Sequence, residues 1–292
     1  MGSNPDMLPL LRFGESATQR LSNTTSRMRI SNRVVLITGA SRGIGAACAA
    51  VFRERGAHLI LTARDQGALA DASQPEDLSM AGDITDDAFR ARLVDDGLRR
   101  FERIDILVNN AGAGIYWPPS TAPLEEVRRM FELNLFAPLS MTQLVLPEMR
   151  RRGDGCVVNV SSIGGEVVLP WISLYCASKF AVSALTIALR SELAGSGVRA
   201  MTVCPGYVGT DFKLHAPGPR PPEGVVGSPS SRFAITPRQC AEAIVRGVER
   251  DARIVVTPRF GWLLIAAQRL FPAVVEARLA AFLKTHQDKA AA

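Results

Sequence analysis

Three polar side chains could together move a proton and hold a carbonyl group. Tyr175 and Lys179 lie four residues apart in LYCASKF, and Ser162 precedes the tyrosine by thirteen residues. On a helix, a spacing of four places the phenol and the ammonium on one face. An ammonium about 5 Å away, at an effective dielectric of about 20, favours the phenolate by roughly 3 kcal/mol, or about two pKa units. The pattern predicts a general acid/base at Tyr175, although an isolated pair of this kind also occurs on solvated helices.

A glycine-rich turn comes after the first predicted strand, RVVLIT, and opens a helix. Glycines let the backbone approach a pyrophosphate, and the helix N-terminus supplies amides and the positive end of its dipole. A tight turn without a ligand is the alternative. We expect a dinucleotide site in TGASRGIG, formed by Gly39, Ser41, Arg42, Gly43, Ile44 and Gly45.

The end of the second predicted strand indicates which dinucleotide binds. An NAD site usually presents an acid there, whereas this strand ends in Thr62-Ala63-Arg64. Arg64 and Arg42 could instead clamp a 2′-phosphate, because guanidinium matches phosphate geometry. Two solvated arginines are the alternative, and Asp65 could neutralise Arg64. The pattern favours NADP(H) over NAD(H).

Strand-like and helix-like segments alternate along the chain, which predicts an α/β fold with a doubly wound parallel sheet and helices on both faces. We expect seven strands in the order 3-2-1-4-5-6-7, at 33–38, 57–63, 78–83, 104–110, 156–162, 198–204 and 253–257. The expected helices are 44–55, 88–101, 123–152, 173–193 and 237–250. Residues 1–30 read as a flexible extension, 31–258 as the domain, and 259–292 as an apolar helical tail.

Composition excludes several classes of protein. The chain has 292 residues, a net charge of +6 and scattered arginines, which does not indicate nucleic-acid binding. Its three histidines lie far apart, so no metal site is expected. Its five cysteines form no CxxC motif and read as free thiols, which suits a cytoplasmic location. No apolar run is long enough to span a membrane.

Residues 31–257 resemble the short-chain dehydrogenase/reductase family in its standard form. The matching motifs occur in the family's order: TGASRGIG, AGDIT, NNAG, FELNLFA, VNVSSIGG, YCASK and PGYVGT. The resemblance implies an oxidoreductase that moves hydride between a nicotinamide and a carbonyl or alcohol. Reduction needs a hydride, an oxyanion stabiliser and a proton, which NADPH, Ser162 and Tyr175 would supply.

The resemblance also implies the remaining cofactor contacts. Asp83 would accept from the adenine amino group, and Ile84 would pack on the ring. Asn109 would tie neighbouring strands together. The adenosine ribose would lie against Asn110, Ala111 and Gly112. The nicotinamide carboxamide would be held by Pro205, Gly206, Val208 and Thr210.

Four residues form the implied catalytic set. Tyr175 would donate the proton, and Ser162 would orient the substrate carbonyl. Lys179 would hold the nicotinamide ribose and lower the tyrosine pKa. Asn134 would hold a water molecule that relays protons to the lysine.

The substrate is expected to be a small lipophilic ketone, aldehyde or alcohol, because the expected pocket walls are mostly apolar. These walls are Ser162, Gly164, Val167, Trp171, Tyr116, Trp117 and Phe212. Residues 212–235 would form a lid over the substrate. The family resemblance further suggests a homodimer or homotetramer, built through 123–152 and 173–193.

Three alternatives stay open. A non-catalytic NADP-sensing regulator could use the same fold, although such proteins typically lose the tyrosine or lysine. A related lyase or epimerase would bring a larger substrate domain. The tail could pack over the substrate entrance or a neighbouring subunit, or it could make a peripheral membrane contact through Trp262 and Phe271 with Arg259, Arg269 and Arg278.

Overall fold

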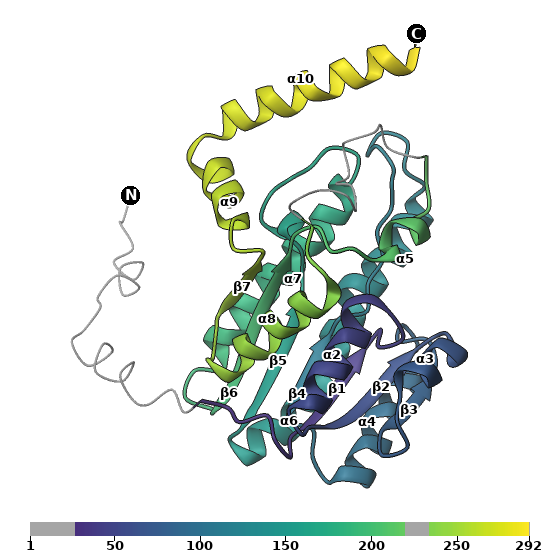
Figure 1. The fold of residues 1–292 in the computed structure, drawn as a ribbon, viewed down its shortest axis with the longest axis vertical. Helices are drawn as coiled ribbons and strands as arrows, with labels where there is room; N and C mark the ends of the chain where they lie inside the picture. Colours follow the sequence, from purple (N-terminus) through teal and green to yellow (C-terminus); the bar gives the residue numbers. More distant parts are fainter. Residues whose placement is uncertain (1–26, 220–233, 292) are drawn as a thin grey trace, which may run out of the picture.

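Seven parallel strands form one sheet in the order β3-β2-β1-β4-β5-β6-β7 (Figure 1). The computed structural model describes residues 27–219 and 234–291. The strands are β1 (Val34–Thr38), β2 (His58–Ala63), β3 (Leu78–Ala81), β4 (Ile106–Asn109), β5 (Gly155–Val160), β6 (Val198–Pro205) and β7 (Ile254–Thr257). The predicted α/β class and strand order are confirmed. The sheet order reverses direction between β1 and β4, which is where ligands bind in open sheets of this kind.

Helices cover both faces of the sheet. On one face, α2 (Gly43–Glu54) packs against α8 (Pro237–Glu249). On the other face lie α4 (Asp87–Phe101), α6 (Ala137–Arg152) and α7 (Ser173–Glu192). The central strands β1, β4 and β5 are buried throughout, because each has a hydrophobic core on both sides. This double burial explains the continuous apolar runs in the sequence.

Capping residues in the sequence fix several helix ends. The Asp65 carboxylate accepts a hydrogen bond from Ala68 N at 3.0 Å and begins the short helix α3 (Gln66–Ala72). Thr236 and Gln239 form a capping box that begins α8. Gly153, with φ of 67°, ends α6 in the left-handed conformation. Helix α3 was not predicted, because seven residues carry too little periodicity to be recognised.

Two predicted boundaries differ from the structure. The helical region expected over 123–152 is divided into α5 (Leu124–Phe131), a π-helical segment η3 (Glu132–Phe136) and α6. At the amino end, Met28 and Ile30 are buried in the core cluster beneath α2 and α8, so the packed domain begins before residue 31. Neither side chain could be assigned from the sequence, because both lie outside any periodic run.

The tail forms two helices, α9 (Gly261–Leu270) and α10 (Pro272–Ala291), which meet at Phe271. Pro272 is the first residue of α10, where its missing N–H does no harm, whereas a proline inside one continuous helix would break it. After β6 the chain makes a short 3₁₀ turn, η5 (Asp211–His215). Residues 220–233 of the expected lid lie outside the described residues.

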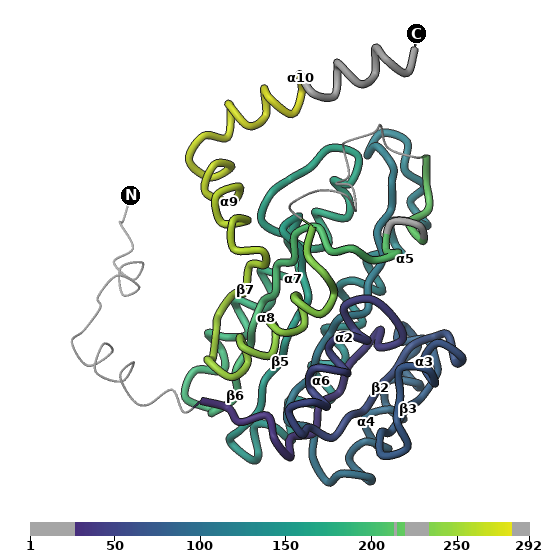
Figure 2. The backbone as a smooth tube through the Cα atoms, in the orientation of Figure 1, coloured from purple at the N-terminus to yellow at the C-terminus, as the bar shows by residue number. Residues whose placement is uncertain are grey.

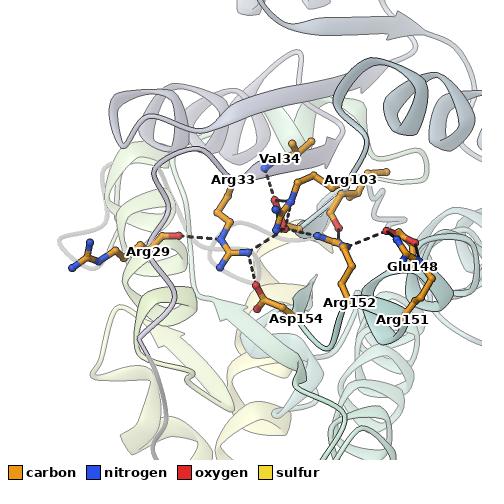
Figure 3. A network of polar contacts seen from close by, with 10 residues as sticks. Arg29, Arg33, Val34, Arg103, Glu148, Arg151, Arg152 and Asp154 are labelled. Carbon is orange, nitrogen blue, oxygen red and sulfur yellow. Dashed lines mark hydrogen bonds and ion pairs between the residues drawn. The ribbon is translucent and has the colours of Figure 1, made fainter.

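A network of arginines and carboxylates lies at the amino ends of the strands, at the edge of the sheet opposite the glycine turn (Figure 3). Asp105 is fully buried and accepts from Val34 N at 2.9 Å. It also pairs with three arginines: Arg33 at 3.2 Å, Arg152 at 2.8 Å and Arg103, whose Nε lies 2.8 Å from Oδ1. Burial raises the pKa of Asp105, but hydrogen bonds from Arg103, Val34 and Arg152 outweigh it and leave the pKa below its ordinary value.

Candidate active site

A cavity of about 1100 Å³ lies beyond the carboxyl ends of the strands. It begins at the glycine turn after β1, passes the ends of β2, β3 and β4, and reaches the loops after β5 and β6. Nearly all the predicted cofactor residues line it, as do Ser162, Tyr175 and Lys179. The topology brings these residues together because parallel strands all end at one edge.

The glycine turn has the geometry that a pyrophosphate needs. Gly39 and Gly43 have φ values of 66° and 56°, which side-chain-bearing residues rarely adopt. At Gly45 a Cβ would lie 2.0 Å from the Gly39 carbonyl oxygen, so only glycine fits. Within the described residues, the N-terminus of α2 has no side-chain cap. Its first amides are therefore available to an anion, and the residues present fit a dinucleotide.

Thr38 and Asn110 hold this turn against the end of β4. The Thr38 hydroxyl accepts from Asn110 N and Ala111 N, both at 3.0 Å. In return, Asn110 Nδ2 donates to the Thr38 and Gly39 carbonyl oxygens at 3.0 and 3.1 Å. No role was predicted for Thr38 from the sequence. Its position as the first residue of TGASRGIG could have indicated that it holds the turn.

The expected adenosine end is formed by Asp83 and Ile84. Asp83 is exposed, and one carboxylate oxygen accepts from Thr85 N and Oγ1 at 2.9 and 2.8 Å. These bonds fix the carboxylate and leave its second oxygen for a ligand. Ile84 is buried beside it and lines the cavity. Asn109 donates to Asn159 Oδ1 at 2.8 Å and so links β4 to β5.

Two arginines lie at the rim of the cavity next to the end of β2. Asp65 lies 3.8 Å from Arg42 Nη2, whereas Arg64 has no ion-pair partner within the described part of the chain. Arg42 Nη1 also lies 2.7 Å from His215 Nε2. The alternative in which Asp65 neutralises Arg64 is therefore not what the structure shows. Asp65 caps α3 and faces Arg42 instead.

Ser162 and Tyr175 lie on the wall after β5. The serine comes after β5 and accepts from Gly164 N at 3.0 Å, which holds its hydroxyl at the start of a tight turn, η4 (Ile163–Gly165). Tyr175 lies in the first turn of α7, and its ring is 5.7 Å from that of Phe212, centre to centre. Phe212 comes from the turn η5 after β6, so this turn reaches the tyrosine on α7.

Lys179 is buried one turn beyond Tyr175, with 4% of its surface exposed. Its ammonium donates to the Val160 carbonyl oxygen at 2.9 Å and lies 5.8 Å from the centre of the tyrosine ring. A Cβ at Gly112 would lie 3.3 Å from Nζ, so glycine there keeps the ammonium open to the cavity. Burial lowers the pKa of Lys179 to about 8.

The pKa of Tyr175 is raised, which contradicts the expected lowering. Burial raises it above its ordinary value and outweighs a hydrogen bond with Ser162 that lowers it. The expectation from spacing treated the ammonium as a full charge and ignored desolvation. Lys179 is itself buried and loses its proton more easily, so it stabilises a phenolate less than expected.

Asn134 lies in the π-helical segment η3 and is buried. Its Oδ1 accepts from Ala113 N, and its Nδ2 donates to Ala113 O, both at 2.8 Å. Nδ2 also donates to Ser178 Oγ at 3.0 Å, and that hydroxyl donates to the Tyr175 carbonyl oxygen. Both amide protons are used, so a relay water on this side chain would have to donate to Oδ1. The π-bulge aims Asn134 at α7, as such bulges do at functional sites.

The segment expected to hold nicotinamide comes after β6. Gly206 N donates to the Thr257 carbonyl oxygen at 2.7 Å, and Val208 forms an isolated bridge with Ile235. Thr210 packs toward the glycine turn, since a Cβ on Gly43 would lie 3.2 Å from its methyl group. The two cofactor loops therefore contact one another.

The substrate side of the cavity differs in part from the predicted walls. Gly164, Tyr116 and Phe212 line it as expected. Trp171, Val167 and Trp117 are not among the residues that line it. Further residues line the cavity but were not predicted from the sequence, among them Leu133, Leu169, Ile172, Tyr207 and His215. In the sequence, only their closeness to the recognised motifs could have indicated them. Most lie outside regular helices and strands, so no periodicity shows which way their side chains point.

All five cysteines are free and buried. No group of three metal-ligating side chains comes together within the described ranges. Every helix in those ranges is too short or too polar to span a bilayer.

The family model for short chain dehydrogenases matches residues 33–217, which is well over half of the chain. The chain belongs to the short-chain dehydrogenase/reductase family. Dehydrogenase/reductase SDR family member 7B of Mus musculus is similar to this short-chain dehydrogenase, with 33% identity over 230 residues, 74% of this chain and 71% of the relative. No finding among the comparisons supports the non-catalytic alternative.

Two solved structures of the family contain different cofactors. A Burkholderia cenocepacia short chain dehydrogenase in complex with NADP is 29% identical, with a TM-score of 0.73 over 86% of this chain and 99% of that one. The 3-ketoacyl-(acyl-carrier-protein) reductase of Brucella melitensis, complexed with NADH, is 25% identical, with a TM-score of 0.71 over 78% and 97%. This short-chain dehydrogenase is thus an oxidoreductase of a family that uses nicotinamide cofactors.

Proposed function

We propose that this protein is an NADP(H)-dependent oxidoreductase that interconverts a lipophilic carbonyl compound and its alcohol, with Tyr175 as general acid/base. One observation carries the proposal. Ser162, Tyr175 and Lys179 lie on one wall of the cavity whose other end is the glycine turn. A hydroxyl, a phenol and a buried ammonium beside a dinucleotide cradle suit proton transfer to a carbonyl oxygen.

When bound, the nicotinamide supplies or accepts a hydride. Ser162 holds the substrate carbonyl oxygen, and Tyr175 donates its proton to that oxygen during reduction. The raised tyrosine pKa keeps the phenol protonated at neutral pH, which suits a proton donor. Lys179, with a pKa near 8, can replace that proton. Asn134 supports the helix that carries Tyr175 and Lys179 through its hydrogen bond to Ser178. In alcohol oxidation each proton moves the other way.

The cofactor preference rests on Arg64 and Arg42. Arg64 lines the cavity at the end of β2, without an ion-pair partner among the described residues, and Arg42 lies across the turn. A 2′-phosphate would give Arg64 an ion-pair partner and Arg42 a second one beside Asp65. The NADP complex of the Burkholderia relative is consistent with this, and the NADH complex of the Brucella relative makes it a question for measurement.

The substrate class rests on the apolar side chains at the catalytic end. Leu169, Ile172, Ile163 and Phe212 line the cavity near Tyr175. A 3-ketoacyl-(acyl-carrier-protein) reductase among the relatives makes a ketone on a fatty chain one candidate of this kind. The five buried free thiols support a cytoplasmic location.

The chain is further proposed to act as a homodimer or homotetramer. Apolar side chains on the outer faces of η3, α6 and α7 are exposed, which favours contact with a second copy. They are Phe136, Leu139, Phe180, Leu185 and Ile187.

The test is cofactor turnover by purified protein with a panel of carbonyl compounds of increasing chain length and ring size. We expect NADPH consumption with the apolar members, little with small polar aldehydes, and none without substrate. Absence of turnover across the panel in both directions, by protein that binds NADPH, would contradict the proposed function.

A further inference from the structure

The two C-terminal helices form an arm beyond the body of the domain (Figures 1 and 2). Helix α9 continues from the carboxyl end of β7 and packs against that strand, and α10 packs against α9. The arm therefore projects at the edge of the sheet where the cavity lies. At its base, Ile265 is buried with Val167, Cys204 and Val256, which fixes α9 to the domain.

The exposed surface of this arm is strongly apolar. Leu263 is 72% exposed and Phe271, at the elbow between the helices, is 61% exposed. Trp262, Leu264, Leu270 and Val274 are exposed as well. Apolar side chains of this size gathered on one projection indicate an interaction surface, because water-exposed patches of this kind are rare on monomers.

The arm is also basic. Residues 259–292 contain five lysines and arginines and two acidic residues, and therefore carry half of the net charge of +6. Arg259 and Arg278 flank the apolar side chains, while Arg269 is taken up by an ion pair with Glu166. The other half of the net positive charge lies on the rest of the chain, so a second copy offers no overall charge complement. A membrane with anionic head groups complements both features of the arm, because it carries negative charge above an apolar layer.

We propose that the α9–α10 arm docks on a lipid membrane with anionic head groups. Trp262, Leu263, Leu270 and Phe271 insert between the head groups, and the side chains of Arg259 and Arg278 lie among the phosphates. Every helix in the described ranges is too short or too polar to cross a bilayer, so the contact is peripheral. Docking at the edge of the cavity would bring its mouth near the membrane.

The experiment is flotation of the full chain with two kinds of vesicle, phosphatidylcholine alone and phosphatidylcholine mixed with phosphatidylserine. We expect association with the mixed vesicles, weakened by high salt because exposed charges are screened. The double variant Leu263→Glu/Phe271→Glu should lower the apparent affinity by roughly tenfold or more, since two apolar side chains no longer insert. Leu124→Glu is the matched control, because Leu124 is 68% exposed on α5 and should leave flotation unchanged.

Thermal unfolding and light scattering make the outcomes decisive. All variants should keep the wild-type melting temperature, because the replaced side chains are exposed. If folded wild-type protein does not float with either kind of vesicle, the proposal is overturned. If it binds the neutral and the mixed vesicles equally, the proposed role of anionic head groups is overturned. If the arm instead covers a second copy, the double variant would form smaller species in solution and wild type would not float. None of these readouts uses activity, so they stand apart from the proposed function.

Discussion

The ammonium of Lys179 lies 5.8 Å from the centre of the Tyr175 ring and donates to the Val160 carbonyl oxygen at 2.9 Å. The two side chains are one helical turn apart, as their spacing requires, but both are perturbed by burial. The lysine pKa is lowered and the tyrosine pKa is raised. Burial thus acts against the charged form of each, which suits the proposed roles of Tyr175 as the proton donor and Lys179 as the group that replaces its proton.

The first prediction concerns Lys179 and pH. Its pKa falls from 10.5 to about 8 on folding, so the folded state holds fewer protons than the unfolded state between these values. The penalty for burying the charge is roughly 3 kcal/mol below that window and fades as the pH rises through it. Wild type should gain about 2 kcal/mol relative to Lys179→Met between about pH 8 and pH 10. Urea unfolding of both proteins measures this difference, and parallel curves would refute the lowered pKa.

The second prediction removes the phenol hydroxyl. Tyr175→Phe keeps the ring that packs beside Phe212, so folding and NADPH binding should be unchanged. Loss of the proton donor should reduce kcat by about 100-fold to 10,000-fold. Steady-state kinetics with the best carbonyl substrate, together with an NADPH binding titration, provides the check. Turnover within tenfold of wild type would remove Tyr175 from the role of general acid.

The third prediction tests the cofactor preference. Wild type should bind NADPH about ten to a hundred times more tightly than NADH, because a charged hydrogen bond to phosphate contributes about 1.5–3 kcal/mol. Arg64→Asp should abolish or reverse this preference, and Arg42→Ala should reduce it while freeing His215 and Asp65. Arg92→Asp, on the far helix α4, should have no effect. Equal affinities of wild type for both cofactors would show that the two arginines are solvated surface charges.

The fourth prediction concerns Asp105 at the opposite edge of the sheet. Asp105→Asn leaves three arginines without their shared carboxylate and should destabilise the fold by about 3 kcal/mol. This value is at the lower end of the range for a broken buried ion pair, because the arginines are partly exposed. The depressed pKa means that the ion pairs stabilise the fold above the ordinary carboxyl pKa and are lost as pH falls through the folded value. Wild type should lose this advantage over the variant in acid.

Asp154→Asn is the matched control, because its partly exposed pair with Arg33 should contribute only about 1 kcal/mol or less. NADPH turnover at low temperature should be unchanged in both variants, since neither residue lines the cavity. Equal, small losses of stability would show that the three arginines are adequately solvated without Asp105.

Periodicity and backbone demands made the strands, their order and the glycine turn predictable from the sequence. Buried strands appear as continuous apolar runs, and short connections restrict the order in which parallel strands can pair. Gly45 could be assigned because only glycine lets Gly39 approach so closely. The π-bulge at Asn134, the inward turn of Met28 and the sign of the Tyr175 pKa shift could not be predicted. Each depends on packing between segments far apart in the chain, which no local pattern encodes.

Glu166 and Arg269 make another such long-range contact. Glu166 is buried, and its Oε2 lies 2.5 Å from Arg269 Nη2 on α9, across 103 residues of sequence. Glu166 belongs to the loop between Ser162 and α7, in which Ile163, Leu169 and Ile172 line the cavity. We therefore expect Arg269 to hold this loop, and with it the substrate wall, in position. Because its side chain is 65% exposed, we expect Arg269→Ala to reduce stability by only about 1–2 kcal/mol.

The same variant should raise the KM for the carbonyl substrate severalfold while NADPH affinity stays unchanged, because the glycine turn lies at the other end of the cavity. Arg269→Lys keeps the positive charge and should leave the KM close to that of wild type. Adding Glu166→Gln to Arg269→Ala should recover stability, since the unpaired buried charge is then gone. Arg278→Ala, one helix further along, serves as the control. If Arg269→Ala and Arg278→Ala give the same KM and the same unfolding curve, α9 does not position the substrate loop.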